Sequence, residues 1–300
     1  MKTEDDSESK GFSLKKKTIL IIIGSFILCL IAFLYFFHKD TDEDIESIAD
    51  DALSRDIEYD ELSGVFTTQG VDVVIDESAV AVSGDAASES GMKKIYLTFD
   101  DGPSKYTDTI LDILSKHNVK ATFFVNAKEG EAAEAAYRRI VEDGHTLAMH
   151  SYNHVYADVY ASTETFRADT RKLQEFLYSI TGYWSRYYRF PGGSSNRVSK
   201  IPMKEFVECL KEDGITYFDW NIMSGDAVKG GLSTETIVRN CTKDIDRFDE
   251  CMILMHDAAS RYTTVEALEP IIEFFEQRGD CVILPISDDT VPIQHILREK

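Results

Sequence analysis

Basic residues are scarce in this sequence relative to acidic ones. Its 300 residues include 32 lysines and arginines against 53 aspartates and glutamates, which gives a formal net charge of -21. A protein that binds nucleic acid needs a basic face, because contacts with phosphates supply much of the affinity. The charge therefore argues against a nucleic-acid partner. It also argues against long-range electrostatic attraction to an anionic polymer.

Cysteine is also rare, and its spacing excludes one class of metal site. None of the five cysteines lies in a CxxC pair, so the sequence does not indicate a thiolate metal site. Cys29 falls in a long apolar run, where it is a plain apolar filler. The other four allow one or two disulfides in an oxidising compartment, or remain free buried thiols. Cys251 and Cys281 each open a strand-like run, so neighbouring strands could bring them together.

Charged residues are absent from residues 18–37. At about 1.5 Å per residue, a helix of this length covers the roughly 30 Å core of a bilayer. We predict a cytoplasmic tail over 1–17 and a single transmembrane helix over 18–37. Lysines precede this span and acidic residues follow it, so the rest of the chain is predicted to lie outside the cell membrane. A cleaved signal peptide is the alternative, but no small-x-small cleavage site follows the run.

Residues 38–91 contain few large apolar side chains and many acidic and small ones. This composition is typical of a flexible spacer, here an acidic linker outside the membrane. A short ordered piece is possible at 71–82, where valines alternate with other residues. The sequence contains no internal repeat in this range.

From residue 92 onward, short apolar runs alternate with stretches of helical period. The apolar runs are 95–99, 121–125, 146–149, 187–190, 216–220, 252–255 and 282–284. The helical stretches are 107–116, 132–142, 163–180, 202–212, 234–247 and 265–277. This alternation predicts a single α/β domain over 92–300, a barrel of about seven parallel strands that is closed or nearly so. A doubly wound open sheet is the alternative.

Polar residues follow several of the predicted strands at the point where each strand ends. They are Asp100 and Asp101, His150 and His154, Arg189, Asp219 and Trp220, and His256 with Asp257. In a parallel barrel the carboxyl ends of all strands share one face, so we expect these side chains to lie together.

The sequence HSYNH at 150–154 places two histidines four residues apart. On one helical turn this spacing directs both imidazoles to the same side. With one aspartate from a neighbouring strand end they form a frequent open site for a catalytic divalent metal. Such a metal lowers the pKa of its water and polarises a carbonyl group, which predicts hydrolysis.

Four motifs together resemble the NodB-homology polysaccharide deacetylases, which form carbohydrate esterase family 4. They are TFDDGP at 98–103, HSYNH at 150–154, RFPGG at 189–193 and LMHD at 254–257. The resemblance spans about residues 93–286. It implies a distorted (β/α) barrel that removes acetyl groups from sugars with the help of a metal, mostly N-acetyl groups of chitin or peptidoglycan.

The resemblance also implies a role for each matching residue. Asp101, His150 and His154 would bind the metal, which could be zinc, cobalt, nickel or manganese. Asp100 would be the general base. Arg189 would pair with Asp100 and keep it ionised, and His256 would be the general acid that protonates the leaving amine.

Two motifs depart from the family pattern. The backbone N–H that stabilises the carbonyl oxygen belongs in the family to a residue that is usually aromatic, and here that residue is Gly192, so one wall of the substrate groove is missing. The family has five ordered motifs, and the run DWNIMSGDA at 219–227 stands at the fourth of them, between RFPGG and LMHD, but it lacks the first aspartate of that motif. Either Asp219 or Asp226 could orient His256, and we favour Asp226. Trp220 either stacks on a sugar ring or belongs to the core.

We therefore expect a membrane-tethered metal-dependent N-deacetylase that acts outside the cytoplasm on an aminosugar polymer, foremost the N-acetylglucosamine of peptidoglycan. One alternative is an O-acetyl esterase that acts on an acetylated glycan such as xylan. The other is a glycan-binding pseudoenzyme, which the altered fourth motif suggests.

Overall fold

The computed structural model describes residues 57–60, 65–68 and 91–296, with side chains described only in the last range. The predicted cytoplasmic tail at 1–17, the predicted membrane span at 18–37 and the ordered piece suggested at 71–82 lie outside the described residues. Within the described ranges, no helix combines the length and the apolar character needed to cross a bilayer.

Two short strands lie in the range predicted as a flexible linker. Strand β1 (Ile57–Asp60) pairs antiparallel with β2 (Val65–Thr68), with Ile57 opposite Thr68 and Asp60 opposite Val65. Both segments contain β-branched and aromatic residues, which favour extended backbone. The prediction for 38–91 did not include this pair.

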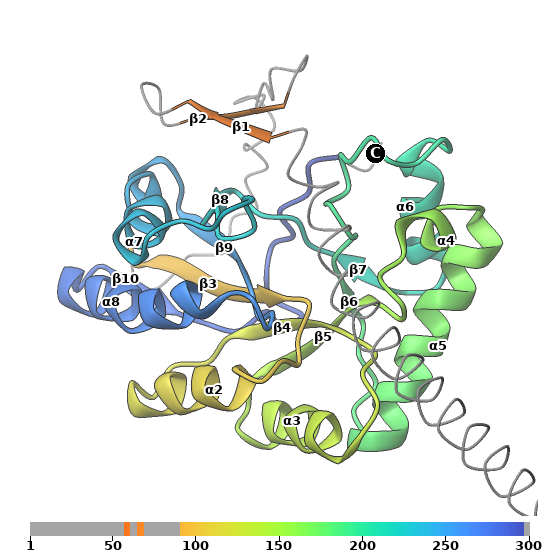
Figure 1. The fold of residues 1–300 in the computed structure, drawn as a ribbon, viewed down its shortest axis with the longest axis horizontal. Helices are drawn as coiled ribbons and strands as arrows, with labels where there is room; N and C mark the ends of the chain where they lie inside the picture. Colours follow the sequence, from red (N-terminus) through yellow and green to blue (C-terminus); the bar gives the residue numbers. More distant parts are fainter. Residues whose placement is uncertain (1–56, 61–64, 69–90, 297–300) are drawn as a thin grey trace, which may run out of the picture. The chain divides into compact units, whose positions relative to one another are not determined.

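A curved parallel sheet forms the centre of the described domain (Figure 1). Its strands are β3 (Lys93–Asp100), β4 (Thr122–Asn126), β5 (Thr146–Ser151), β6 (Tyr187–Tyr188), β7 (Thr216–Tyr217), β8 (Ile222–Met223), β9 (Glu250–His256) and β10 (Cys281–Ile283). Seven of them follow the order β7-β6-β5-β4-β3-β9-β8, and β10 pairs with β3 beside this path. The stepwise order from β3 to β7 is that of a barrel rather than of a doubly wound sheet. The domain is an α/β half-barrel, because β7 and β8 do not pair with each other.

The helices lie around the outside of this sheet (Figure 1). They are α2 (Thr107–Lys116), α3 (Glu131–Glu142), α4 (Tyr156–Val159), α5 (Thr163–Thr181), α6 (Met203–Glu212), α7 (Thr234–Thr242) and α8 (Tyr262–Arg278), with a 3-10 turn η2 (Ile245–Arg247). Six of these helices were predicted within a few residues. Helix α7 is shorter than the predicted helix 234–247, because it ends at Thr242 and only the turn η2 follows. The short elements α4 and β8 were not predicted.

The side chains of β3 point alternately to the two faces of the sheet, and each face borders a different hydrophobic core. Ile95, Leu97 and Phe99 are fully buried in the large core that includes helix residues. Tyr96 points to the other face and packs in a smaller cluster with Phe124 and other strand residues. Because side chains alternate along a strand, Thr98 and Asp100 share the face of Tyr96. The catalytic candidate Asp100 therefore lies inside the half-barrel.

The segment 291–296 lies where β7 lacks a partner toward β8. The backbone N–H of Asp219, just after β7, donates to the carbonyl oxygen of Ile293 at 2.7 Å, and the side-chain amide of Gln294 donates to the carbonyl of Tyr217 at 3.0 Å. The hydroxyl of Tyr217 also contacts the carbonyl of Ile296. These bonds satisfy backbone groups at the end of β7 that a further strand between β7 and β8 would bind in a closed barrel.

The four cysteines after the apolar run are free thiols. Strands β9 and β10 lie on opposite sides of β3, so Cys251 and Cys281 are not on neighbouring strands. The suggestion that neighbouring strands bring these two residues together is wrong for this reason. Burial raises the pKa of Cys251 to about 12, which keeps this thiol protonated and unreactive.

Candidate metal and catalytic site

The predicted site residues meet at the carboxyl end of the sheet. Asp100 is the last residue of β3, and His256 is the last residue of β9. The two are direct register partners in the parallel ladder between these strands. Asp101 follows with φ 73°, a left-handed conformation that turns the chain out of the strand. Two consecutive carboxylates thereby diverge from one strand end.

The two histidines of the HSYNH motif come from a strand and the loop after it. His150 lies in β5, and His154 lies beyond the end of that strand with φ 53°. The prediction that a helical turn places them on one side is therefore wrong. Their side chains nevertheless converge, because the backbone bends at 152–153 and reverses at His154. The two ring centroids lie 5.1 Å apart.

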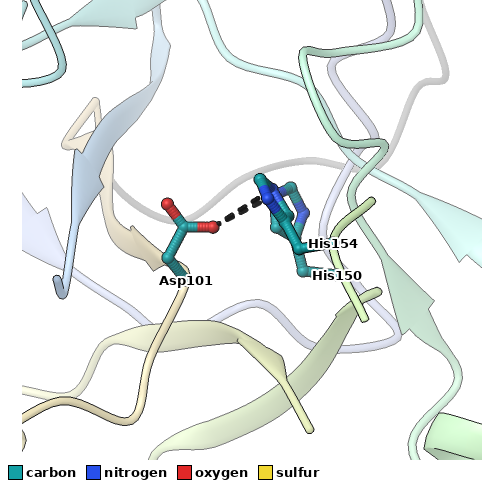
Figure 2. Close-up of side chains that lie close together, drawn as sticks. All are labelled: Asp101, His150 and His154. Carbon is teal, nitrogen blue, oxygen red and sulfur yellow. Dashed lines mark ion pairs between the residues drawn. The ribbon is translucent and has the colours of Figure 1, made fainter. Parts of the chain in front are cut away.

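Asp101, His150 and His154 form a compact group of three ligand atoms (Figure 2). Oδ1 of Asp101 lies 3.6 Å from Nε2 of His150 and 3.3 Å from Nε2 of His154. Ligands bound at about 2.0–2.2 Å around one tetrahedral ion lie roughly this far apart. The spacing therefore fits a single divalent metal.

The protonation of the three groups also suits a metal. Nδ1 of His150 lies 2.7 Å from the carbonyl oxygen of Arg189, which can only accept, so Nδ1 carries the proton and Nε2 offers a lone pair. Burial lowers the pKa of His154 and keeps its ring neutral. Burial alone would raise the pKa of Asp101, but the positive charge that His154 and His150 carry when they are protonated outweighs burial and lowers that pKa below its usual range.

Asp100 borders this group from inside the half-barrel. Its carboxylate is 3% exposed, and its Oδ2 lies 4.0 Å from Nε2 of His150. Its other oxygen accepts a hydrogen bond from Nη1 of Arg189 at 2.8 Å. Asp100 therefore has one oxygen tied to a cation and the other turned toward the candidate metal ligands.

Arg189 is fully buried, so its pair with Asp100 is not a surface ion pair. Its guanidinium also donates to the hydroxyl of Thr98 at 2.7 Å and to the carbonyls of Phe218 and Asp219, each at 3.0 Å. Its Cζ lies 4.1 Å from the centre of the Phe124 ring. A buried guanidinium with this many acceptors holds Asp100 in one orientation.

His256 has a carboxylate partner, Asp226, in the segment after β8. Its Nδ1 donates to Oδ1 of Asp226 at 2.7 Å, and its backbone N–H donates to Oδ2 of the same carboxylate at 2.8 Å. Thr264 and Ser224 also donate to Asp226, which is buried. Burial opposes the charge on His256, but Asp226 outweighs it and raises the pKa of the imidazole to about 9.

Asp219 is the other aspartate considered as a partner for His256, and it is occupied elsewhere. It accepts hydrogen bonds from the backbone N–H and the hydroxyl of Ser194 at 2.8 and 2.5 Å. It also accepts from the backbone N–H of His295 at 2.8 Å. Asp219 thus connects the loop after β6 to the segment 291–296, and Asp226 is the residue that contacts His256.

Gly192 and Trp220 lie near the site in different ways. Gly192 has φ 75°, which favours glycine, and no acceptor within the described residues meets its backbone N–H. Trp220 is half-buried, and its ring lies against Gly193, where an added Cβ would come within 2.8 Å of Cη2. His295 packs edge to face on Trp220 with ring centroids 5.0 Å apart. Trp220 is therefore a rim residue rather than part of either core cluster.

Two residues that support the candidate metal ligands were not predicted from the sequence. Asn126, the last residue of β4, donates from Nδ2 to Oδ1 of Asp101 at 3.2 Å. Asp169, on α5, accepts from the hydroxyl of Ser151 at 3.1 Å and the backbone N–H of Tyr152 at 2.9 Å, so it holds the turn between the two histidines. The position of Asn126 at a strand end was a signal that could have identified it, whereas nothing in the local sequence singles out Asp169.

Comparison with known proteins identifies a family whose members resemble this chain. The profile of the polysaccharide deacetylase family matches residues 87–212, which include Asp100, the three candidate metal ligands and Arg189. Asp226 and His256 lie beyond the matched range. Their assignment as a pair therefore depends on the contacts described above.

Individual relatives agree with the profile. The peptidoglycan-N-acetylglucosamine deacetylase PgdA of Listeria monocytogenes is 31% identical over 59% of this chain, which spans only 36% of PgdA. The chitin deacetylase of Colletotrichum lindemuthianum is 35% identical over 62% of this chain and 75% of that protein. Among solved structures, the catalytic domain of a peptidoglycan N-acetylglucosamine deacetylase from Eubacterium rectale is 35% identical, with a TM-score of 0.66 over 74% of this chain and 100% of that domain.

Proposed function

The chain belongs to the polysaccharide deacetylase family, and from this premise we propose that it hydrolyses N-acetyl groups of an aminosugar polymer with a bound divalent metal. The observation that carries the proposal is the convergence of four strand ends. The candidate metal ligands Asp101, His150 and His154 lie at the ends of β3 and β5, beside the carboxylate of Asp100. Arg189 after β6 and His256 at the end of β9 complete the group. A metal-dependent amide hydrolase uses such a set: a metal site for the water, a base for its proton and an acid for the leaving amine.

Asp101, His150 and His154 are the residues that would hold the metal. The bound ion would polarise the acetyl carbonyl and lower the pKa of water. One carboxylate and two imidazoles suit zinc, cobalt, nickel or manganese, and zinc is our first choice. Asn126 and Asp169 would orient these ligands, because they bond to Asp101 and to the turn between the histidines.

Asp100 is our candidate for the general base. Its Oδ2 faces the ligand group, while Arg189 donates a hydrogen bond to its Oδ1 and fixes its orientation. In that position Asp100 would take a proton from the attacking water. Arg189 would act through Asp100 and is a positioning residue.

His256 is our candidate for the general acid. It is charged at neutral pH because Asp226 raises its pKa to about 9, against the opposing effect of burial. A charged imidazole can give its Nε2 proton to the departing amine, which is a poor leaving group without protonation. The register pairing of His256 with Asp100 puts acid and base on adjacent strands.

The backbone N–H of Gly192 is our candidate donor to the carbonyl oxygen that becomes negative during attack. It has φ 75° and no competing acceptor among the described residues. A preorganised backbone donor of this kind stabilises an oxyanion at no cost of reorientation during the reaction. Trp220, whose ring lies against the neighbouring Gly193, is a candidate for contact with the sugar.

The proposed substrate is peptidoglycan, with a chitin-like polymer as the other candidate. Peptidoglycan is favoured by two of the relatives, whose names describe peptidoglycan-N-acetylglucosamine deacetylases. The predicted span at 18–37 and the acidic linker also favour it, since they would hold the catalytic domain outside the cytoplasm, close to a cell wall.

The experiment that tests this function measures acetate release and metal content together. The domain from residue 91 onward, metal-free or reloaded with zinc, is incubated with peptidoglycan and with N-acetylglucosamine oligomers. We expect acetate only from the reloaded protein and about one metal ion per chain. Metal binding without acetate from either substrate would contradict the proposal.

A His256→Ala variant distinguishes the deacetylase from an O-acetyl esterase. An amide needs protonation of the leaving nitrogen, so the variant should lose about 100-fold or more on an N-acetyl substrate. An acetyl ester has a better leaving group and should be hydrolysed at a rate close to that of the wild type. If ester hydrolysis is the only reaction detected, and the variant retains it, the esterase assignment replaces ours.

We also propose that residues 18–37 anchor the protein in the cell membrane with residue 38 onward outside. This proposal is supported by the sequence, in which lysines precede an uncharged run and acidic residues follow it. A reporter enzyme that is active only outside the cytoplasm, fused after residue 300, should be active and membrane-bound. The same fusion without residues 1–37 is the control and should be inactive in the cytoplasm. Activity of a cytoplasm-specific reporter in the full-length fusion would refute the orientation.

A further inference from the structure

Tyr156 lies beside both the metal ligands and the candidate oxyanion donor. It begins the short helix α4, two residues after His154, and its ring packs edge to face on His154 with centroids 5.5 Å apart and an angle of 79°. The side chain is half-buried. The position of Tyr156 near the metal site therefore follows from the same turn that orients His154.

Tyr156 also fills the space in front of Gly192. A Cβ added to Gly192 would lie 3.3 Å from both Cε1 and the hydroxyl oxygen of Tyr156. Such contacts are tighter than ordinary van der Waals distances, so a side chain at residue 192 would require the ring of Tyr156 to shift by a few tenths of an ångström. The sequence predicts that one wall of the substrate groove is missing at Gly192, and the aromatic ring of Tyr156 from another element lies at that place.

Further contacts hold the helix of Tyr156 against the loop that carries Gly192. Tyr160, one helical turn along the chain, lies beside Tyr156 with ring centroids 6.0 Å apart and an angle of 55° between the ring planes. The hydroxyl of Tyr160 donates to the carbonyl oxygen of Pro191 at 2.8 Å. Asn196 donates to the carbonyl oxygens of Pro191 and Gly193, at 3.3 and 2.8 Å. The loop that carries Gly192 is thus bonded to the segment that carries Tyr156.

We propose that Tyr156 is a specificity-determining residue whose ring forms one wall of the sugar site and contacts the acetylated pyranose. The inference rests on the proposed function, because it places the acetyl group between the metal ligands and Gly192. Aromatic rings pack well on the C–H face of a sugar, and a tyrosine hydroxyl can bond to a polar sugar group at the same time. The wall reaches the site from α4, after β5, instead of from the loop after β6.

A purely structural role is the competing explanation, since Tyr156 could serve only to hold the ring of His154. The two roles differ in their effect on a small substrate. Loss of a sugar wall should matter for a glycan and not for a small acetyl ester that lacks a sugar. Loss of His154 orientation should affect both substrates equally and should weaken metal binding.

The test compares Tyr156→Ala and Tyr156→Phe with the wild type on N-acetylglucosamine oligomers and on 4-nitrophenyl acetate. For Tyr156→Ala we expect the KM for the oligomers to rise about tenfold, with kcat/KM for the ester and the metal content within about twofold of wild type. Tyr156→Phe keeps the ring and should recover most of the oligomer affinity. Tyr178→Ala, which removes an exposed tyrosine near the far end of α5, is the matched control and should change neither substrate.

Three results would overturn the inference. An unchanged KM for the oligomers in Tyr156→Ala would exclude the sugar wall. An equal loss on oligomer and ester, or a loss of metal, would assign the residue to support of His154. If the wild-type protein released no acetate from any glycan, the proposed function would fail and the inference with it, whereas the first two results leave that function intact.

Discussion

Two hydrogen bonds join His256 to the carboxylate of Asp226: Nδ1 of the imidazole donates to Oδ1 at 2.7 Å, and the backbone N–H donates to Oδ2 at 2.8 Å. The double contact fixes both the position and the charge of the ring. Burial lowers the pKa of an isolated imidazole, and Asp226 reverses that effect, so that His256 keeps its proton up to about pH 9. A pH profile can therefore report on this pair.

Asp226→Asn should move the alkaline limit of deacetylation to lower pH. In the wild type the acid form of His256 is lost as the pH rises through about 9, so activity should fall there. Without the negative charge of Asp226, burial is opposed only by the more distant Asp101 and Asp100, so the pKa of His256 should fall from about 9. The measurement is kcat/KM between pH 5 and 10 on an N-acetyl oligomer.

Asp219→Asn is the control for this shift, since it makes the same chemical change at a buried aspartate that does not bind the ring of His256. It should lower the melting temperature, because Ser194 and His295 lose a charged acceptor. The pH at which its deacetylation activity falls on the alkaline side should stay near 9. An equal shift in both variants would mean that Asp226 acts on His256 only through general loss of structure.

Arg189→Gln should destabilise the domain by about 3–5 kcal/mol and abolish activity, because Asp100 would be left as a buried charge without its cation. The double variant Arg189→Gln with Asp100→Asn removes that uncompensated charge. It should recover part of the lost free energy of unfolding but none of the activity. Urea denaturation of the two variants gives the comparison, and a double variant less stable than the single one would disprove the charge argument.

Asp169→Ala should weaken metal binding without touching a ligand. Asp169 holds the turn between His150 and His154 through Ser151 and Tyr152. We expect the dissociation constant of zinc to rise about tenfold or more, as is typical when an outer support of a metal ligand is removed. A competition titration with a zinc chelator measures this constant without reference to activity.

Two variants make the Asp169 result specific. Asp169→Asn keeps an acceptor oxygen and should recover much of the zinc affinity. Asp158→Ala removes a nearby carboxylate that bonds only to the exposed side chain of Asn153, and it should bind zinc as the wild type does. Equal weakening by Asp158→Ala would show that charge near the loop matters, and not the bonds of Asp169.

His145 should make the domain less stable in mild acid. Its Nδ1 accepts the backbone N–H of Ala121 at 3.0 Å, and burial lowers its pKa to about 4. Above pH 6.5 the imidazole is neutral in both states, and its contribution to stability is complete. As the pH falls from 6.5 to 4 only the unfolded state gains the proton, so the folded state loses up to about 3 kcal/mol.

His145→Gln removes that titration. The difference in unfolding free energy between wild type and variant should narrow or reverse between pH 7.5 and pH 4.5, since carboxylates titrate in both proteins alike. Denaturant curves at the two pH values measure it. A constant difference would mean that the pKa of His145 is ordinary.

The domain could be predicted well from sequence because its strands and helices are long and strongly patterned. The run at 95–99 and the helix at 107–116 are examples, as is the order of strand-end residues. The two-residue strands were harder. Strand β8 (Ile222–Met223) lies in a stretch with no alternating pattern, and it forms because β9 offers it a partner over Ile253 and Leu254.

The site was predicted as a set of residues but not as a geometry. Residues 150–154 have a helical spacing, and yet His150 is held in β5 by sheet pairing while His154 turns back with a positive φ. Contacts between residues far apart in sequence decided the rest. Asp226 binds His256 across 30 residues, and Tyr156 lies against Gly192 although α5 and β6 separate the two in sequence, so no local pattern could specify either contact.

The segment 291–296 has a consequence for the behaviour of the domain in solution. An unpaired strand presents backbone groups that can recruit a strand from another molecule, which is a common route to aggregation. By bonding to Asp219 and Tyr217 at the end of β7, this segment shields that edge. Its presence would keep a half-barrel with an incomplete circle of strands from adding copies of itself edge to edge.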